Sequence, residues 1–160
     1  MGSLLLVAHM DASDERIQQI LLFQGSLPYS LDLLMLTLVL GRPDLSTALT
    51  KLHVFRLTEY SKIIYFDADV LPLQPLSHLF LTPHEFSACP DVGWPDVFNS
   101  GCMVLEPGED KFQELTQLVK TQGSWDGADQ GLLNEWRGGN WNRLSFTYNT
   151  TPTAAYTYVK

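Results

Sequence analysis

The stretch Lys62-Ile63-Ile64-Tyr65-Phe66-Asp67-Ala68-Asp69-Val70 is the part of the chain that best predicts its fold. Apolar and aromatic residues run directly into two aspartates, a composition typical of a buried strand with a polar end. Residues two apart on an extended chain point to the same face, about 7 Å apart at a rise of roughly 3.3 Å per residue. Asp67 and Asp69 are therefore predicted to project together from the carboxyl end of a strand, where open α/β sheets bind ligands.

The chemistry of this acid pair has two interpretations. Two neighbouring carboxylates repel each other, so a positive group is expected beside Asp67 and Asp69. A hard divalent cation with oxygen ligands is the natural partner of such a pair. The other interpretation is a solvated pair of acids in a turn, and a motif as short as Asp-x-Asp does not decide between them.

The composition is that of an acidic globular protein. A length of 160 residues favours one domain with a sizeable core, and a hydrophobic fraction of 45% is ordinary for such a domain. The formal net charge of −8 argues against nucleic acid or an anionic membrane as the main partner. An acidic protein can still bind a diphosphate, provided that a metal ion supplies positive charge at the site.

The cysteines and the apolar runs bear on the cellular compartment. Cys89 and Cys102 have no metal-binding spacing, which favours a reduced intracellular protein. The apolar run 31–40 is shorter than the about 20 residues that a membrane-spanning helix needs. The first residues lack the length and the basic flank of a secretory signal. These features predict a soluble, cytoplasmic protein.

Strand and helix patterns alternate along the chain, which predicts an α/β fold. Strands are expected at 4–8, 62–67, 86–89 and 98–105, and helices at 13–25, 46–60, 109–123 and 126–136. The run 31–40 is ambiguous between strand and buried helix, and the tail from Trp141 reads as irregular or strand structure. A glycine inside a predicted strand, Gly101, indicates a bulge or a close approach of the backbone to a ligand.

A second polar group, Asp126-Gly127-Ala128-Asp129-Gln130-Gly131, lies at the start of the last predicted helix. Asp126 fits a helix N-cap, and Asp129 lies in the first turn, where the helix dipole favours acids. The flanking glycines would also let a ligand approach the backbone, and a helix N-terminus presents unpaired amide donors. Capping and ligand binding both stay open.

Weaker signals come from four single residues. Asn99 and Ser100 interrupt an apolar strand, so they need hydrogen-bond partners if buried, either sugar hydroxyls or neighbouring backbone. Lys51 lies among apolar residues, and a lysine in that position is most often on the surface. Arg42 precedes a proline, which is typical of a turn.

Taken together and in order, these signals resemble the glycogenins, a group within the retaining family 8 glycosyltransferases, in a fungal version. The resemblance extends from about Arg42 to Tyr158. The blocks that carry it are Arg42-Pro43, Leu49-Thr50-Lys51-Leu52, Phe66-Asp67-Ala68-Asp69, Gly93-Trp94-Pro95-Asp96, Phe98-Asn99-Ser100-Gly101 and Asp126-Gly127-Ala128-Asp129-Gln130-Gly131.

The resemblance implies a fold, a reaction and partners. The fold is GT-A-type and Rossmann-like, a nucleotide-sugar-binding domain whose mixed, mainly parallel sheet is flanked by helices. The reaction is transfer of glucose from UDP-glucose to a tyrosine and then to the growing glucan, as in the initiation of glycogen synthesis, with Mn²⁺ as cofactor. A homodimer and glycogen synthase are the implied protein partners.

The resemblance also implies a role for each matching residue. Asp67 and Asp69 are implied as metal ligands, Asp129 and Lys51 as catalytic residues, and Tyr156 as the acceptor tyrosine. The implied contacts of the nucleotide sugar are Arg42, Lys51, Asp67, Ala68, Asp69, Asn99, Ser100, Asp126, Asp129 and Gln130.

Two features of the family pattern have no match in this sequence. Family members have an N-terminal Thr-Asn-rich loop that holds the uridine and a C-terminal motif that supplies a metal-binding histidine. The single domain is therefore expected to be incomplete at both ends. The alternatives are a catalytically impaired remnant of this domain and a family 8 transferase that uses another sugar or acceptor. A covalent intermediate and same-face attack both remain open as routes to retention.

Overall fold

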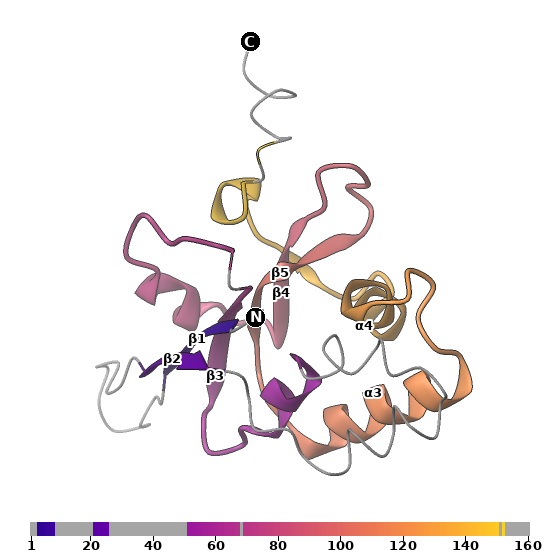
Figure 1. The fold of residues 1–160 in the computed structure, drawn as a ribbon. Helices are drawn as coiled ribbons and strands as arrows, with labels where there is room; N and C mark the ends of the chain where they lie inside the picture. Colours follow the sequence, from indigo (N-terminus) through magenta and orange to yellow (C-terminus); the bar gives the residue numbers. More distant parts are fainter. Residues whose placement is uncertain (1–2, 9–20, 26–50, 68, 151, 153–160) are drawn as a thin grey trace.

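The computed structural model describes residues 3–8, 21–25, 51–67, 69–150 and 152. The strands are β1 (Ser3–Ala8), β2 (Leu21–Gly25), β3 (Lys62–Phe66), β4 (Phe86–Pro90), β5 (Phe98–Leu105) and β6 (Asn142–Arg143). The helices are α3 (Glu109–Thr121), α4 (Asp129–Arg137) and the 3₁₀ helices η2 (Lys51–Arg56), η3 (Ser77–Leu81) and η4 (Phe146–Tyr148). A mixed sheet flanked by helices confirms the predicted α/β class (Figure 1). No helix in these ranges is long and apolar enough to cross a membrane.

The described strands form one sheet in the order β2-β1-β3-β5-β4-β6. β5 lies between β3 and β4 and is antiparallel to both, β1 is antiparallel to β2 and β3, and β6 alone among these strands runs parallel to its neighbour, β4. The expectation of a mainly parallel sheet is therefore wrong for the described strands. Residues 91–97 connect β4 to β5, and so short a connection makes a hairpin, because a parallel pair needs a crossover of about a dozen or more residues.

The direction of β5 places the start of one strand beside the end of another. Phe66, at the end of β3, pairs with Cys102 in the middle of β5, so the residues that begin β5 lie beyond the end of β3. The pairing of β4 with β5 shifts register between Ala88, opposite Met103, and Cys89, opposite Asn99. This irregularity contains Gly101, so the bulge expected at that glycine is confirmed.

Apolar side chains cover both faces of the sheet. On one face, Ile63 packs in a cluster with Phe55 of η2 and Leu115 of α3. On the other face, Ile64 packs in a cluster with Phe80 of η3. Each such side chain contributes roughly 1.5–3 kcal/mol when it leaves water. The apolar run of β3 is thus buried on both faces, as its composition predicted.

Cys89 and Cys102, on β4 and β5, are buried free thiols. A hydrogen bond with Cys89, together with burial, raises the pKa of the Cys102 thiol. Cys102 therefore stays neutral and packs as a small apolar side chain in the cluster beneath η3.

Two predicted helices differ in the structure. A helix was expected at 13–25, of which residues 13–20 lie outside the described residues. The remaining part, Leu21–Gly25, is the strand β2, because its backbone pairs with β1. The helix expected at 46–60 is described from Lys51, where it is the 3₁₀ helix η2. Phe55 O accepts a hydrogen bond from Gly108 N (2.8 Å), a tertiary contact that takes the place of the next helical bond. The run 31–40 lies outside the described residues.

The remaining expectations on secondary structure are confirmed. The strands expected at 86–89 and 98–105 are β4 and β5, and the helix before Gly123 is α3. Gly123 ends that helix with a positive φ of 73°, and its N–H donates to Leu118 O and Val119 O. The tail contains the short β6 and η4 in otherwise irregular chain.

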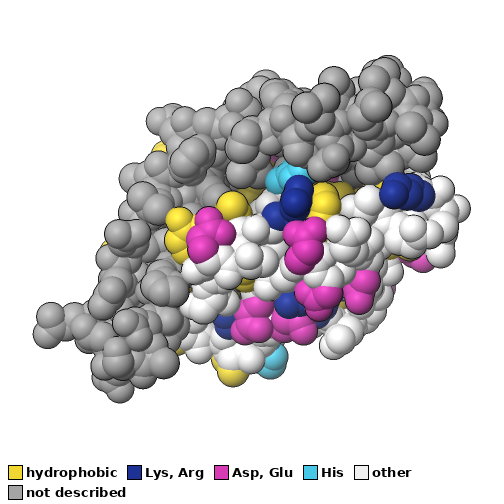
Figure 2. Space-filling model, turned by 90° about the horizontal axis from the view of Figure 1, so that it is seen from below, with side chains coloured by type: hydrophobic (Ala, Val, Ile, Leu, Met, Phe, Trp, Pro, Cys, Tyr) yellow, Lys and Arg dark blue, Asp and Glu magenta, His cyan; other side chains and the backbone are white. Residues whose placement is uncertain are grey.

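Acidic and basic side chains lie close together on the face of the molecule shown in Figure 2. Among the described ion pairs, Arg56 Nε lies 3.1 Å from Glu109 Oε2 and Arg137 Nη1 lies 3.2 Å from Glu85 Oε1. A hydrogen bond from Gln113 is the largest of the contacts that lower the pKa of Glu109. The Arg56–Glu109 pair is exposed on both sides, and such pairs contribute little to stability.

Candidate functional site

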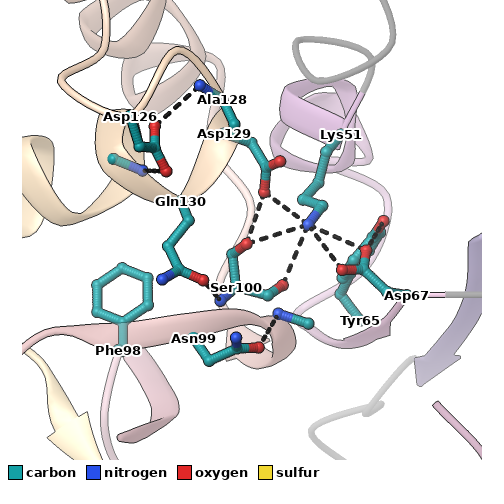
Figure 3. Close-up of polar contacts among 12 residues, drawn as sticks. Lys51, Tyr65, Asp67, Phe98, Asn99, Ser100, Asp126, Ala128, Asp129 and Gln130 are labelled. Atoms are coloured by element: carbon teal, nitrogen blue, oxygen red, sulfur yellow. Dashed lines mark hydrogen bonds and ion pairs between the residues drawn. The ribbon is translucent and has the colours of Figure 1, made fainter. Parts of the chain in front are cut away.

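The polar residues singled out in the sequence converge where β3 ends and β5 begins (Figure 3). Asp67 N donates to Gly101 O (2.9 Å), which continues the pairing of the two strands beyond β3. The first residue of η2, Lys51, and the first residue of α4, Asp129, face the same point. The site therefore takes its residues from four elements that are distant in sequence.

Lys51 is the centre of this group. Its Nζ lies 3.0 Å from Asp67 Oδ1 and 2.6 Å from Asp129 Oδ2, and it donates to Ser100 Oγ (3.2 Å) and Ser100 O (3.3 Å). The lysine is 8% exposed, so the surface position that its type suggested is wrong. A buried ammonium is costly unless it is paired, and two carboxylates pair it here.

Neighbouring side chains fix the two carboxylates in turn. Ser100 Oγ donates to Asp129 Oδ2 (2.6 Å), and Tyr65 Oη donates to Asp67 Oδ1 (2.9 Å). Lys51 Nζ also lies 5.1 Å from the centre of the Tyr65 ring, within range of a cation–π contact. Serine at position 100 therefore has the partners that a buried hydroxyl requires, and they are side chains of the site.

Asp126 organises the start of α4. Its Oδ1 accepts hydrogen bonds from Ala128 N (2.8 Å) and Ser124 Oγ (2.6 Å), and its Oδ2 accepts one from Gly131 N (2.9 Å). The N-cap position itself is Ala128, so Asp126 serves the helix start from two residues further out. The expectation that Asp126 is the N-cap is therefore wrong, although its carboxylate does accept a hydrogen bond from a first-turn N–H of α4. Its contact with a sugar stays a prediction.

A network of amide side chains continues the site beyond Ser100. Gln130 Oε1 accepts a hydrogen bond from Ser100 N (3.3 Å), and Asn99 Oδ1 accepts bonds from Gly101 N (2.9 Å) and Asn149 Nδ2 (2.7 Å). A Cβ at Gly101 would lie 2.8 Å from Asn99 Oδ1, so the glycine is needed for this close approach. Figure 3 shows Asn99 and Gln130 on the β5 side of Lys51.

A pocket of about 610 Å³ adjoins this group. Of the predicted site residues, Asp67, Asp69 and Asn99 line it, and Asp69 is exposed. His78 Nε2 and Tyr148 Oη, 2.7 Å apart, lie on its wall. The two aspartates predicted to point together thus share one concave surface.

The pocket offers oxygen donors of the kind that a hard divalent cation prefers. Asp67 and Asp69 supply carboxylates, and the side chains of Asn99 and Asn149 also line the wall. In the described parts of the chain, no group of three or more His, Cys, Asp and Glu side chains is arranged to hold a metal ion. These residues fit an oxygen-liganded cation that completes its coordination with water or substrate oxygens.

The structure brings most of the predicted residues together. Lys51, Asp67, Ser100 and Asp129 are in direct contact, and the other predicted residues placed around them are Asp69, Asn99, Asp126 and Gln130. Arg42, Ala68 and Tyr156 lie outside the described residues.

Three residues of the group were not singled out from the sequence: Tyr65, Asp91 and Asn149. Tyr65 reads as an ordinary strand residue, and Asp91, which follows a proline and stands two before a glycine, reads as a turn residue. Asn149 belongs to a tail without a periodic pattern. Their polar type was the one available signal. It was a weak one, because polar side chains are common at strand ends and in turns.

Comparison with known proteins gives a consistent result. The model of the family "Glycosyl transferase family 8" matches residues 10–159. Similar proteins include a glycogenin of Cryptococcus neoformans var. grubii (57% identical over 141 residues) and a glycogenin of Neurospora crassa (48% over 121 residues). Human glycogenin-1 is 43% identical over 127 residues.

Each of these alignments covers 76% of this chain. The chain spans 15% of the Cryptococcus protein, 18% of the Neurospora protein and 36% of the human protein.

Proposed function

Because the chain belongs to glycosyl transferase family 8, we propose that it forms the nucleotide-sugar site of a retaining glucosyltransferase. The reaction we propose is transfer of glucose from UDP-glucose to a tyrosine and then to the growing glucan, as in the initiation of glycogen synthesis. The observation that carries this proposal is the buried contact of Lys51 with Asp67, Asp129 and Ser100 beside the pocket. We also propose that the chain represents one glycosyltransferase domain and acts in the cytoplasm.

The charge arrangement supports the first half of the reaction. Breaking a sugar–phosphate bond leaves negative charge on the diphosphate and electron deficiency on the sugar carbon. Lys51 offers a fixed ammonium, and Asp129, whose Oδ2 is held by Ser100, offers a carboxylate that can stabilise the sugar carbon. In this proposal Asn99, Ser100, Asp126 and Gln130 bind the sugar. Arg42 and Ala68 bind the nucleotide.

A divalent cation fits the same proposal. Asp67 and Asp69 would hold it, with Mn²⁺ as the ion that we propose. When bound, such an ion neutralises charge that develops on the leaving diphosphate. Tyr65 supports Asp67 by donating to its Oδ1, which keeps one carboxylate oxygen in a fixed place.

The acceptor and the partners complete the proposal. Tyr156 is the acceptor tyrosine that we propose, and a homodimer would let one copy present its tyrosine to the other. Glycogen synthase is the partner that would extend the product.

Intact mass after incubation with UDP-glucose and Mn²⁺ tests this function. The mass of the wild-type chain is expected to increase in steps of one hexose. Asp129→Asn is expected to abolish these steps because the carboxylate is lost, and Tyr156→Phe because the acceptor is lost. Asp110→Asn, which removes an exposed acid on α3, is the matched control and is expected to leave the steps in place.

Three results would change the conclusion. A chain that binds UDP-glucose but never gains mass is an impaired remnant of the domain. A mass increase that is faster with UDP-galactose than with UDP-glucose indicates another donor sugar. Absence of binding to both UDP and UDP-glucose in calorimetry overturns the proposal.

A further inference from the structure

Asp91 connects the hairpin loop after β4 to the amide network of the site. Its Oδ1 accepts hydrogen bonds from Gly93 N (2.8 Å) and Trp94 N (3.2 Å), which holds the turn of the loop. Its Oδ2 accepts bonds from Gln130 Nε2 (3.2 Å) and Asn99 Nδ2 (3.4 Å). One carboxylate therefore serves two purposes, with one oxygen for each.

The amide groups that reach Asp91 all have the same polarity. Asn149 donates to Asn99, and Asn99 and Gln130 donate to Asp91. At the opposite end of each amide, a backbone N–H donates to the carbonyl oxygen, from Gly101 to Asn99 and from Ser100 to Gln130. Each of these two side chains is thus held by a donor on one side and an acceptor on the other.

A carboxylate is suited to end such a chain because it only accepts hydrogen bonds when it is ionised. Burial alone would raise the pKa of Asp91, but the hydrogen bonds from Gly93, Gln130, Asn99 and Trp94 outweigh it and lower the pKa below its ordinary value of 3.8. Asp91 is therefore ionised at neutral pH. An asparagine at this position has one oxygen and one NH₂ group. If its oxygen kept the hydrogen bonds of the turn, its NH₂ group would face the NH₂ groups of Asn99 and Gln130, which are also donors.

We propose that Asp91 is a positioning residue that fixes which end of the Asn99 and Gln130 amides faces the sugar, and so sets the preference for the glucosyl group. This inference rests on the proposed function, since it concerns the donor sugar of the same site. The orientation of an amide decides whether a sugar hydroxyl meets a donor or an acceptor at that point. A reversed amide would leave polar groups of the site unpaired, which is how hydrogen-bonding sites reject the wrong ligand.

The variant Asp91→Asn separates positioning from loop structure. It has nearly the same shape, and its remaining oxygen can still accept the bonds of Gly93 and Trp94, so a residue needed only for the turn would tolerate it. Asp96→Asn, an exposed acid in the same 91–97 loop, is the matched control for loss of one charge. Asp91→Glu is the conservative variant, because it restores an acceptor with one additional methylene.

The first measurement is independent of activity. In ¹H–¹⁵N spectra, the side-chain NH₂ signals of Asn99 and Gln130 are expected to move in Asp91→Asn, to stay in Asp96→Asn, and to return toward wild type in Asp91→Glu. Near-ultraviolet circular dichroism verifies that each variant is folded. Unmoved NH₂ signals in folded Asp91→Asn overturn the proposal.

The second measurement isolates the sugar. Calorimetric titration with UDP-glucose and with UDP, each with Mn²⁺, gives the ratio of the two affinities. In Asp91→Asn the affinity for UDP-glucose relative to UDP is expected to fall about tenfold, which corresponds to one or two lost hydrogen bonds. The affinity for UDP is expected to stay unchanged. Moved NH₂ signals with an unchanged ratio would overturn the role in sugar preference. If the wild-type chain does not bind UDP-glucose, the proposed function and the sugar preference fail together, while the NH₂ signals still decide whether Asp91 orients the amides.

Discussion

Lys51 shows how strongly a single side chain depends on partners that are remote in sequence. Its charge is balanced by Asp67 on one side and Asp129 on the other, and Ser100 occupies the space between them. The ammonium is 8% exposed, so its pairing is what makes burial tolerable. Any change that removes the ammonium leaves two carboxylates facing each other.

The variant Lys51→Met is expected to lower the free energy of unfolding. Removal of one partner of a buried ion pair costs roughly 3–5 kcal/mol, and because Asp67 is 36% exposed we expect a loss of about 3 kcal/mol. Urea unfolding at neutral pH measures it. The exposed Lys120 on α3 is the control, and Lys120→Met is expected to change stability by less than about 0.5 kcal/mol. Equal effects of the two substitutions would contradict the conclusion that Lys51 is a buried, paired ammonium.

Asp91 is expected to make the free energy of unfolding depend on pH. Its pKa is lowered in the folded protein, so it contributes stability that is present above its ordinary pKa of 3.8 and is lost as the pH falls through the folded value. The stability advantage of wild type over Asp91→Asn is therefore expected to shrink between about pH 5 and about pH 3. Urea unfolding across this range measures the difference. A difference that stays constant would show that the carboxylate has the same pKa in both states.

At the scale of elements, α4 owes its position to polar contacts at its start and in its middle. Asp126 accepts from Gly131 N and Ala128 N at the first turn. Further along, Asn134 accepts from Phe98 N (2.9 Å) and donates to Phe98 O (2.8 Å), which attaches the helix to the backbone at the start of β5. These contacts keep Asp129 within reach of Lys51.

Gly131→Ala tests the start of α4. A Cβ at Gly131 would collide with the carboxylate of Asp126 and lie 2.6 Å from Ser124 Oγ, so the capping contacts have to shift. Alanine normally favours a helix over glycine by about 1 kcal/mol, whereas here we expect a net loss of about 1 kcal/mol in unfolding free energy.

The control for this substitution is Gly139→Ala, where a Cβ would meet nothing within 4 Å. It is expected to change the unfolding free energy by less than about 0.5 kcal/mol. A stabilising effect of Gly131→Ala would show that Asp126 moves aside without loss.

At the scale of the whole molecule, β3 carries a buried lysine contact at each end. Lys51 meets Asp67 just beyond the carboxyl end, and Lys62 opens the strand with its Nζ 3.2 Å from Glu106 Oε1 and bonded to the carbonyls of Thr82 and His84. The five steps along the chain from Lys62 to Asp67 span about 16 Å at a rise of ~3.3 Å per residue. The two lysine contacts share no side chain, and the backbone of β3 connects them.

The substitutions Lys51→Met and Glu106→Gln are therefore expected to be additive. Sites more than about 10 Å apart without shared partners usually add within ~0.5 kcal/mol. Glu106 is 41% exposed, so its own loss is expected to be about 1 kcal/mol or less. Urea unfolding of both single variants and the double variant measures the coupling. A coupling energy above about 1 kcal/mol would show that strain is transmitted between the two ends of β3.

The sequence predicts β3, β5 and α3 well because each has a clear apolar pattern. Glycine or proline lies near the limits of β5 and α3, and two aspartates follow β3. The resemblance selects Lys51, Asp67, Ser100 and Asp129, and the structure brings these four together. Burial of Lys51 could not be read from its neighbours, since the carboxylates that pair it come from other elements.

Other features were beyond prediction for similar reasons. The antiparallel direction of β5 was not predicted, because strand composition does not specify it and the short 91–97 connection, which favours a hairpin, was not used. Leu21–Gly25 suits a helix and a strand equally, and pairing with β1 decides it. Asp91 makes the turn that its context indicates, but its second oxygen binds Gln130, 39 residues later.

The position of β5 between β3 and β4 has a consequence for the order of folding. The β4–β5 hairpin closes a short loop, and hairpins form within about 1–10 μs. On its β5 side, β3 pairs with the free edge of this hairpin. The bond from Asp67 to Gly101 closes a longer loop and costs more chain entropy. We expect Lys51 to meet both carboxylates only after that closure, so that the chain acquires its charged centre in the final, cooperative step of folding.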